Sequence, residues 1–319
     1  MIIADRNQLL NGNSFTLGVS GSGKSFISKE EIASIRLKDK DADIIIIDPE
    51  REYSKLVRAF GGEVIKISAT SRNHINAMDM TKDYGDGANP VILKSEFILS
   101  LCEQLIGSSN LGAKQKSIID RCTANTYRFY QQGNYQGTPP TLQDFREELL
   151  KQDEPEAKEI ALAIELFTNG SLNTFLNRIT SNRNKGKHTY IFIDEIYLLF
   201  QYEYSANFLF TLWKRVRKYG ACCTGITQNV EDLLQSHTAR TMLANSEFII
   251  MLNQASTDKT ELARLLNISD LQMSYITNVK AGEGLIKIGS VLVPFVNKFP
   301  RNTELYKLMS TKPGEEFEE

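Results

Sequence analysis

The sequence predicts an α/β fold with a mostly parallel sheet and an inserted all-helical subdomain. Strand-like apolar runs alternate with helical patterns over most of the 319 residues, and such alternation is typical of a parallel sheet covered by helices on both faces. Between about residues 89 and 183 the alternation stops, and helical patterns follow one another without a strand. Together these observations predict a sheet domain that is interrupted by a helical segment.

The expected strands and helices follow in chain order. Sheet strands are predicted at 14–17, 43–47, 63–67, 189–193, 221–226 and 247–252. The runs 284–288 and 291–296 enclose the turn residues Gly289 and Ser290, which indicates an antiparallel hairpin at one edge of the sheet. Helices are predicted at 25–36, 91–106, 113–131, 142–152 and 156–167.

The division into domains follows from these elements. We expect a core formed by residues 1–88 and 184–311, an all-helical insert at 89–183, and a C-terminal tail at 312–319. Turn-forming residues border the insert on both sides. The tail holds Pro, Gly and four Glu in eight residues, a composition that favours a frayed chain end.

The composition excludes several classes of protein. Lys and Arg total 37 against 39 Asp and Glu, so the formal net charge is -2 and the overall basic excess of a nucleic-acid-coating protein is absent. The four cysteines have no CxxC spacing, which favours reduced thiols in a cytoplasmic protein. The three histidines are isolated in sequence, so we expect no zinc site. The longest apolar runs fall far short of the ~20 residues that a membrane helix needs.

The most specific motif is a P-loop. Residues 18–25 read Gly-Val-Ser-Gly-Ser-Gly-Lys-Ser and match G-x-x-x-x-G-K-[ST] between a predicted strand and a predicted helix, as this pattern requires. Backbone N–H groups at the glycines and the positive end of the helix can surround phosphate oxygens. Lys24 is expected to reach the β- and γ-phosphates, and Ser25 to bind Mg²⁺. The expected nucleotide contacts in this region are Gly18, Ser20, Gly21, Ser22, Gly23, Lys24, Ser25 and Phe26.

A second motif is an apolar strand that ends in two carboxylates. The run 189–193 leads into Asp194 and Glu195, which is the form of a Walker B segment. Asp194 is expected to hold the Mg²⁺ shell, and Glu195 to polarise the attacking water. The alternative is structural, because many buried strands end in an acidic turn.

A third acidic segment follows the strand at 43–47. Residues 48–53 read Asp-Pro-Glu-Arg-Glu-Tyr and place carboxylates, including Glu50, at the carboxyl edge of the sheet, where open α/β sheets bind ligands. We therefore count Glu50 among the expected nucleotide-binding residues. Helix capping by Asp48, with Pro49 at the first helical position, explains part of the segment equally well.

Two further side chains are candidates near the γ-phosphate. Cations gather at 213–220, where Arg217, or else Arg215, is placed to act as an arginine finger on a neighbouring subunit. Cations also favour a helix C-terminus, and Gly220 suits the position that follows one. Gln228 follows the strand at 221–226 and can sense the γ-phosphate or its water, with a plain turn amide as the alternative.

The chain resembles the ATPase domain of conjugative type IV secretion ATPases of the VirB-four type. The resemblance rests on eight segments in order: GVSGSGKSF, IDPEREY, HINAMD, IFIDE, KRVRKYG, GITQNVEDLL, ANSEFIIMLNQA and FPRNTELYKLM. It implies a RecA-like P-loop ATPase core with an inserted all-α subdomain, related to the HerA and FtsK translocases and to conjugative coupling proteins. It also implies ATP and Mg²⁺ as ligands, with Glu195 as catalytic base, Arg217 as finger and Gln228 as sensor.

The resemblance further implies a setting for the chain. Family members normally carry an N-terminal domain ahead of the P-loop, so this chain looks like an excised C-terminal ATPase domain. The expected assembly is a homo-hexamer or a monomer in equilibrium with oligomers. The expected location is cytoplasmic, at the inner face of the cell membrane, held there by other type IV secretion components or by the missing domain.

Three functional hypotheses follow. The first is an ATP hydrolase that powers assembly of a conjugation channel or pilus and the passage of substrates. The second is a DNA-pumping translocase or coupling protein of the HerA/FtsK type, for which direct contact with DNA is expected. The third is a nucleotide-gated assembly module with little turnover of its own, as expected of a P-loop subunit that needs a neighbour's arginine.

Overall fold

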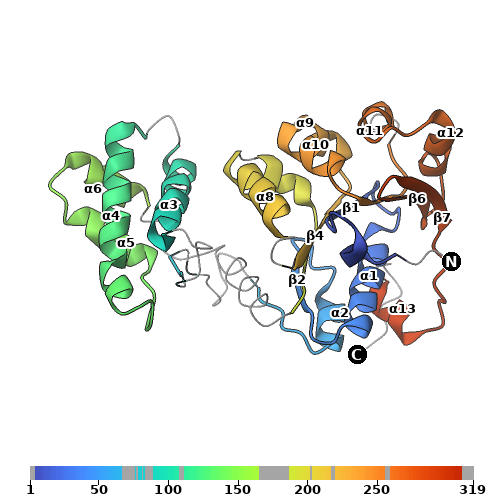
Figure 1. Cartoon of the computed structure of the whole chain (residues 1–319), viewed down its shortest axis with the longest axis horizontal. Helices are drawn as coiled ribbons and strands as arrows, with labels where there is room; N and C mark the ends of the chain where they lie inside the picture. Colours follow the sequence, from blue (N-terminus) through green and yellow to red (C-terminus); the bar gives the residue numbers. More distant parts are fainter. Residues whose placement is uncertain are drawn as a thin grey trace. The chain divides into compact units, whose positions relative to one another are not determined.

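The computed structural model describes residues 4–66, 76, 78–80, 82, 89–107, 111–164, 187–201, 203–216, 220–255 and 259–310. The chain divides into two compact units. Unit 1 comprises Met1–Val64 and Asn182–Glu319, and unit 2 comprises Ile65–Ser181 (Figure 1). The boundaries that the sequence predicts for the insert, residues 89 and 183, stay predictions.

Unit 1 is built on a mixed sheet in which seven strands lie within the described residues, in the order β2-β3-β4-β1-β5-β6-β7. The first five in this order run parallel, and β6 and β7 are antiparallel. The predicted α/β class with a mostly parallel sheet is confirmed. The strands are β1 Ser14–Leu17, β2 Asp43–Ile47, β3 Thr189–Ile193, β4 Ala221–Thr227, β5 Phe248–Met251, β6 Glu283–Ile288 and β7 Val291–Val296.

The central strands are buried over their whole length because both of their faces are covered. Every residue of β1, β3, β4 and β5 is buried. The hairpin β6–β7 is joined by Gly289 and Ser290, and the φ of 60° at Gly289 is the left-handed conformation that a tight two-residue turn uses. This hairpin forms one edge of the sheet, as predicted, and β2 forms the other.

Helices cover both faces of the sheet (Figure 1). On one face α1, α2 and α13 pack on side chains of β2, β3 and β4, including Tyr190 and Phe192. On the other face the Trp213 ring of α8 lies 4.9 Å from the Phe15 ring of β1. The helices of unit 1 are α1 Lys24–Lys38, α2 Ser54–Ala59, α8 Glu203–Arg215, α9 Val230–Gln235, α10 His237–Ala244, α11 Lys259–Leu266, α12 Asp270–Met273 and α13 Glu304–Met309, with 3-10 turns at Arg6–Gln8, Ile196–Gln201 and Ser274–Ile276.

Unit 2 is helical throughout its described residues. Its helices are α3 Pro90–Ile106, α4 Ala113–Gln132, α5 Leu142–Leu150 and α6 Pro155–Ala163. Asn89 caps α3 ahead of Pro90, and Thr141 and Asp144 form a capping box on α5, so both starts carry side-chain signals. The helices enclose a separate core around Tyr127 and Phe145.

Two predictions of local structure are wrong. Residues 63–66 of the predicted strand at 63–67 form no strand, and residue 67 lies outside the described residues. A strand-like apolar run forms a strand only where its side chains are covered, whereas Val64 and Ile65 are 40% and 58% exposed. The predicted helix start at Pro49 is also wrong, because α2 begins at Ser54. The predicted insert borders and the tail at 312–319 lie outside the described residues.

Among the helices that the structure describes, none combines the length and the apolar character needed to cross a membrane.

Candidate nucleotide-binding site

The P-loop leaves the carboxyl end of β1 between the loops that follow β4 and β5. The Gly18 N–H donates to the Thr227 carbonyl at 3.3 Å, and the Val19 N–H donates to the Asn253 carbonyl at 2.8 Å. On the far side of the loop, the Gly282 N–H donates to the Ser22 carbonyl at 3.0 Å. Backbone hydrogen bonds therefore hold the P-loop to three neighbouring segments.

Three glycines are required by the shape of this loop. A Cβ on Gly18 would lie 2.6 Å from Ser22 Oγ and 2.9 Å from Leu252 Cβ, closer than side chains tolerate. Gly21 and Gly23 have φ values of 73° and 101°, a region that glycine enters without steric cost. Gly23 is also the N-cap of α1, so the loop opens directly onto a 15-residue helix whose first N–H groups lack intrahelical partners. This cradle fits the phosphates of a nucleotide.

Lys24 lies among carboxylates at the same sheet edge. It is 7% exposed, and its Nζ donates to the Val19 carbonyl at 3.2 Å. Burial lowers the pKa of Lys24, while the charges of Glu195, Asp194, Glu52 and Glu50 act in the opposite direction. The structure thus brings the P-loop lysine together with the acidic residues that follow β3 and β2.

Asp194 directly extends the pairing of β3 with β2. Its N–H donates to the Ile47 carbonyl at 3.0 Å, which fixes the backbone at the end of both strands. Burial, with the neighbouring charge of Glu195 as a smaller cause, raises the pKa of Asp194 to about 7. A carboxylate that extends from this fixed backbone and has little solvent around it is suited to a divalent cation, whose charge favours the ionised form.

Glu195 has an unusual backbone and an unsatisfied side chain. Its φ is 47°, a left-handed conformation that is uncommon for residues other than glycine and that clusters at functional sites. The residue is 6% exposed, and its Oε2 is buried without a hydrogen-bond partner among the described residues. Burial raises the pKa of Glu195, opposed by a hydrogen bond from the Gln228 backbone and by the charge of Lys24.

Strand order explains how Gln228 reaches this site. Because β4 lies between β3 and β1, the residue that follows β4 emerges between the P-loop and Asp194–Glu195. The next residue, Asn229, caps α9 by accepting a hydrogen bond from the Asp232 N–H at 3.2 Å. Both interpretations of Gln228, as a sensor of the γ-phosphate or as a plain turn amide, stay predictions. Gln228 itself is half-buried beside Glu195.

The segment after β2 forms a compact acidic loop instead of the expected helix start. The Asp48 carboxylate accepts hydrogen bonds from the N–H groups of Glu52 and Tyr53, both at 3.0 Å. Arg51 has a φ of 61°, which no residue in a right-handed helix adopts, so the helix begins only after Tyr53. Glu50 is exposed, whereas Glu52 is half-buried with its Oε2 lacking a partner among the described residues.

The residues that follow β5 were missed by the sequence reasoning. Asn253 accepts the Val19 N–H, and its Oδ1 accepts the Val279 N–H at 3.3 Å. Gln254 Nε2 donates to the Leu17 carbonyl at 3.0 Å, at the point where β1 becomes the P-loop. Two amides directly after a buried strand were the available signal, because the carboxyl ends of parallel strands share one edge.

Two arginines near the end of α8 are predicted as candidate fingers. Arg217 lies outside the described residues, and Arg215 is the last residue of α8. Both stay predictions.

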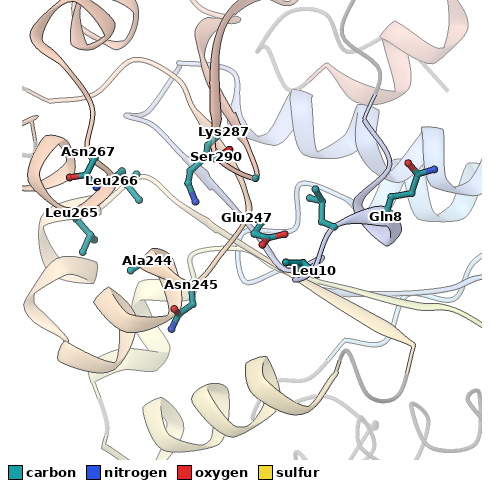
Figure 2. A pocket seen from close by; sticks show the side chains of 12 residues that line it. Gln8, Leu10, Ala244, Asn245, Glu247, Leu265, Leu266, Asn267, Lys287 and Ser290 are labelled. Carbon is teal, nitrogen blue, oxygen red and sulfur yellow. The ribbon is translucent and has the colours of Figure 1, made fainter.

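A separate cavity lies near the amino ends of β1 and β5, whereas the P-loop follows the carboxyl end of β1. It has a volume of about 770 Å³ and is bordered by residues that precede β1 and β5 and by the β6–β7 turn, among them Leu10, Glu247 and Ser290 (Figure 2). It contains none of the predicted site residues, so we assign it no part in nucleotide binding.

Two family models match the chain. The family model described as the central domain of the helicase HerA matches residues 5–209, and the TraG P-loop domain model matches residues 157–295. The uncharacterized protein aq_aa31 of Aquifex aeolicus strain VF5 is 30% identical over 59 residues, 18% of this chain and 22% of that protein. The match thus spans about a fifth of that relative's length.

Two solved structures share the fold. VirB4 of Thermoanaerobacter pseudethanolicus superposes with a TM-score of 0.76 at 21% identity, covering 94% of this chain and 93% of that one. The plasmid coupling protein TrwB, in complex with the non-hydrolysable GTP analogue GDPNP, gives a TM-score of 0.50 at 13% identity, covering 92% and 88%.

Proposed function

The chain belongs to the helicase HerA central-domain family, and on that premise we propose that it hydrolyses ATP to power a conjugative type IV secretion machinery. The observation that carries this proposal is the position of Lys24. Its buried ammonium, at the start of α1, lies among Asp194, Glu195, Glu50 and Glu52 at one sheet edge. A phosphate cradle and a group of carboxylates at the same edge are the two parts that phosphoryl transfer needs.

In this proposal the P-loop binds the nucleotide. The backbone N–H groups of residues 21–25 and the start of α1 orient the phosphates, and Lys24 supplies a positive charge. Ser25 and Asp194 are the residues that would hold Mg²⁺, since a hydroxyl and a carboxylate are ligands that this ion prefers. When bound, Mg²⁺ neutralises charge on the β- and γ-phosphate oxygens.

Glu195 is the proposed general base. Its buried Oε2 has no hydrogen-bond partner among the described residues, so it is available to accept the proton of an attacking water. Burial raises the pKa of Glu195 toward neutral pH, and a carboxylate with a higher pKa is a stronger base. Gln228, which contacts Glu195 through its backbone, is the proposed sensor of the γ-phosphate and the water.

The VirB4-type role is favoured over the other hypotheses by the comparisons. The fold similarity to VirB4 extends over nearly the whole of both chains, whereas the similarity to TrwB is weaker at comparable coverage. That TrwB binds a GTP analogue supports a nucleotide site in this fold. Following the family resemblance, we propose ATP as the nucleotide, assembly into a homo-hexameric ring, and action at the cytoplasmic face of the membrane with other secretion components.

A second candidate is a DNA-pumping translocase. The observation in its favour is the match of the helicase HerA and TraG P-loop models to most of the chain between them. DNA binding by such a motor neutralises phosphates and is sensitive to salt.

One experiment separates these functions. ATP hydrolysis is measured against protein concentration, with and without single-stranded and double-stranded DNA. The secretion ATPase is supported if turnover per subunit rises with protein concentration and is unchanged by DNA. The translocase is supported if DNA strongly stimulates turnover. No hydrolysis at any concentration, with nucleotide binding retained, would leave a nucleotide-gated assembly module.

A further inference from the structure

Lys29 is a second lysine of α1, and it is almost completely buried. It follows Lys24 by five residues and is 1% exposed. Lysine is rarely buried to this degree, because taking an ammonium out of water is unfavourable unless other groups compensate. Burial lowers the pKa of Lys29, and the charges of Glu52, Asp48 and Asp194 oppose that change. The proposed hydrolysis gives this residue no role.

Two contacts fix the Lys29 ammonium. Its Nζ donates to the carbonyl of Met309 at 3.4 Å, and Met309 is the last residue of α13, where helical carbonyls lack intrahelical partners. The same atom lies 5.3 Å from the centroid of the Tyr53 ring, within the range of a cation–π contact. No described carboxylate lies within ion-pair distance of Lys29, so its charge acts on the acidic residues through space.

Tyr53 connects Lys29 to the acidic loop at the nucleotide edge. The Tyr53 side chain is 1% exposed and belongs to the core between α1, α2 and α13. Its N–H and that of Glu52 are both held by the Asp48 carboxylate, which closes residues 48–53 into one loop. Because the loop ends in this buried ring, the position of Glu52 depends on how firmly Tyr53 is held.

Glu52 is acted on by both lysines of α1. Its charge favours the protonated form of Lys24 and of Lys29, and its Oε2 is buried without a hydrogen-bond partner among the described residues. Five residues of helix advance about 7.5 Å along the axis. The two lysines therefore project from positions on α1 that lie about 7.5 Å apart along its axis, and each acts on the loop from its own position.

We propose that Lys29 is a positioning residue for the proposed hydrolysis: it holds the 48–53 loop against α1, so that Glu52 faces Lys24 and Asp194. The catalytic consequence rests on the proposed function, and the structural one rests on the contacts of Lys29, Tyr53 and Asp48. Loss of the Lys29 charge releases the loop, while the P-loop cradle, whose backbone bonds involve other residues, keeps its shape. Catalysis then suffers more than nucleotide binding.

The test compares Lys29→Met with Lys29→Arg in the full chain. Lys29→Met introduces an apolar side chain of similar length and removes the charge. Lys29→Arg keeps the charge. Lys29→Met is expected to lower kcat for ATP by about tenfold or more, as small displacements of catalytic groups do, with KM and the Kd of a fluorescent ATP analogue changed less than about twofold. Lys29→Arg is expected to recover much of kcat.

Lys94→Met is the matched control. Lys94 is also a fully buried lysine, its Nζ donates to the Asp79 carbonyl at 2.9 Å, and it lies 5.0 Å from the Phe97 ring, but it belongs to unit 2. It therefore reports the effect of losing a buried lysine in the unit that does not contain the P-loop. If Lys29→Met and Lys94→Met give the same kcat and KM, Lys29 has only a structural role and the proposal is overturned.

Amide hydrogen exchange tests how firmly the 48–53 loop is held, and it does not depend on ATP hydrolysis. The Glu52 and Tyr53 amides, which the Asp48 carboxylate binds, are expected to exchange faster in Lys29→Met than in the wild type and unchanged in Lys94→Met. If the wild type hydrolyses no ATP, the proposed function fails, but faster exchange still supports the positioning of the loop by Lys29. Unchanged exchange at both amides overturns it.

Discussion

Gly18 and Thr227 are joined by a backbone hydrogen bond of 3.3 Å, at the point where β1 and β4 both end. This bond places the residue after Thr227 beside the P-loop, and β4 in turn pairs with β3, which carries Asp194 and Glu195 at its end. Three segments that are far apart in sequence therefore meet at one sheet edge.

Lys24→Ala is expected to abolish detectable nucleotide binding and to leave the fold intact. The substitution removes the charge that faces the phosphates, and it also removes an ammonium whose burial is itself unfavourable. Titration with a fluorescent ATP analogue, alongside a thermal melt, measures both effects. Binding with wild-type affinity would contradict the P-loop assignment.

Gly18→Ala is expected to disrupt the same site through the backbone. Its Cβ would meet Ser22 Oγ and Leu252 Cβ at 2.6 and 2.9 Å, so the loop must shift, at a cost on the order of 1–3 kcal/mol. Gly133→Ala is the control, because the nearest atoms to a Cβ there lie at 3.6 Å. Nucleotide titration and melting should show a loss for Gly18→Ala alone; equal behaviour of the two variants would argue against a close-packed cradle.

Lys94 makes the stability of unit 2 depend on pH. Burial lowers the pKa of Lys94 from 10.5 to about 7, so between these values the unfolded chain binds more protons than the folded one, and stability rises with pH. Below about pH 7 the folded unit bears the full cost of the buried ammonium. Hydrogen exchange of α4 amides at pH 6.5 and 9 should show more protection at the higher pH after correction for intrinsic rates, and Lys94→Met should lose this difference. The same pH response in Lys94→Met would exclude Lys94 as its cause.

Arg217 is expected to act on the γ-phosphate of a neighbouring subunit. Arg217→Ala and Lys24→Ala should each be inactive alone, whereas a mixture contains sites in which an intact P-loop faces an intact arginine. An arginine finger is worth ~10³ or more in turnover, so even partial recovery stands clear of background in a hydrolysis assay. No recovery in rings shown to be mixed, or full activity of Arg217→Ala alone, would remove the finger from the mechanism.

Most of the fold could be predicted because burial on both faces leaves a plain signal. The strands β3 and β5 are short apolar runs, and each was predicted to within a residue or two. The P-loop was equally clear, since Gly18, Gly21 and Gly23 serve backbone geometry that no other residue meets well. The predicted relation to the HerA group of P-loop ATPases is confirmed by the family match.

The rest depends on tertiary contacts that leave no periodic pattern. Residues 63–66 have the β-branched apolar residues of a strand, but a strand needs a neighbour, and Val64 and Ile65 remain exposed. Asp48 is a residue type that commonly caps helices, yet its carboxylate closes a loop of residues 48–53, and α2 begins only at Ser54. Lys29 has the appearance of a surface lysine on an amphipathic helix, and only the approach of Tyr53 and Met309 buries it.

The turnover of Glu195→Gln tests the central claim most directly. The amide keeps the size of the side chain but cannot take up a proton, so this variant should bind the ATP analogue with near wild-type affinity and hydrolyse ATP at least ~100-fold more slowly, the usual scale for loss of a positioned base. The measurement is single-turnover hydrolysis at protein concentrations where the wild type is active. Near-normal hydrolysis by Glu195→Gln would contradict the account and transfer the base to Glu50 or Glu52.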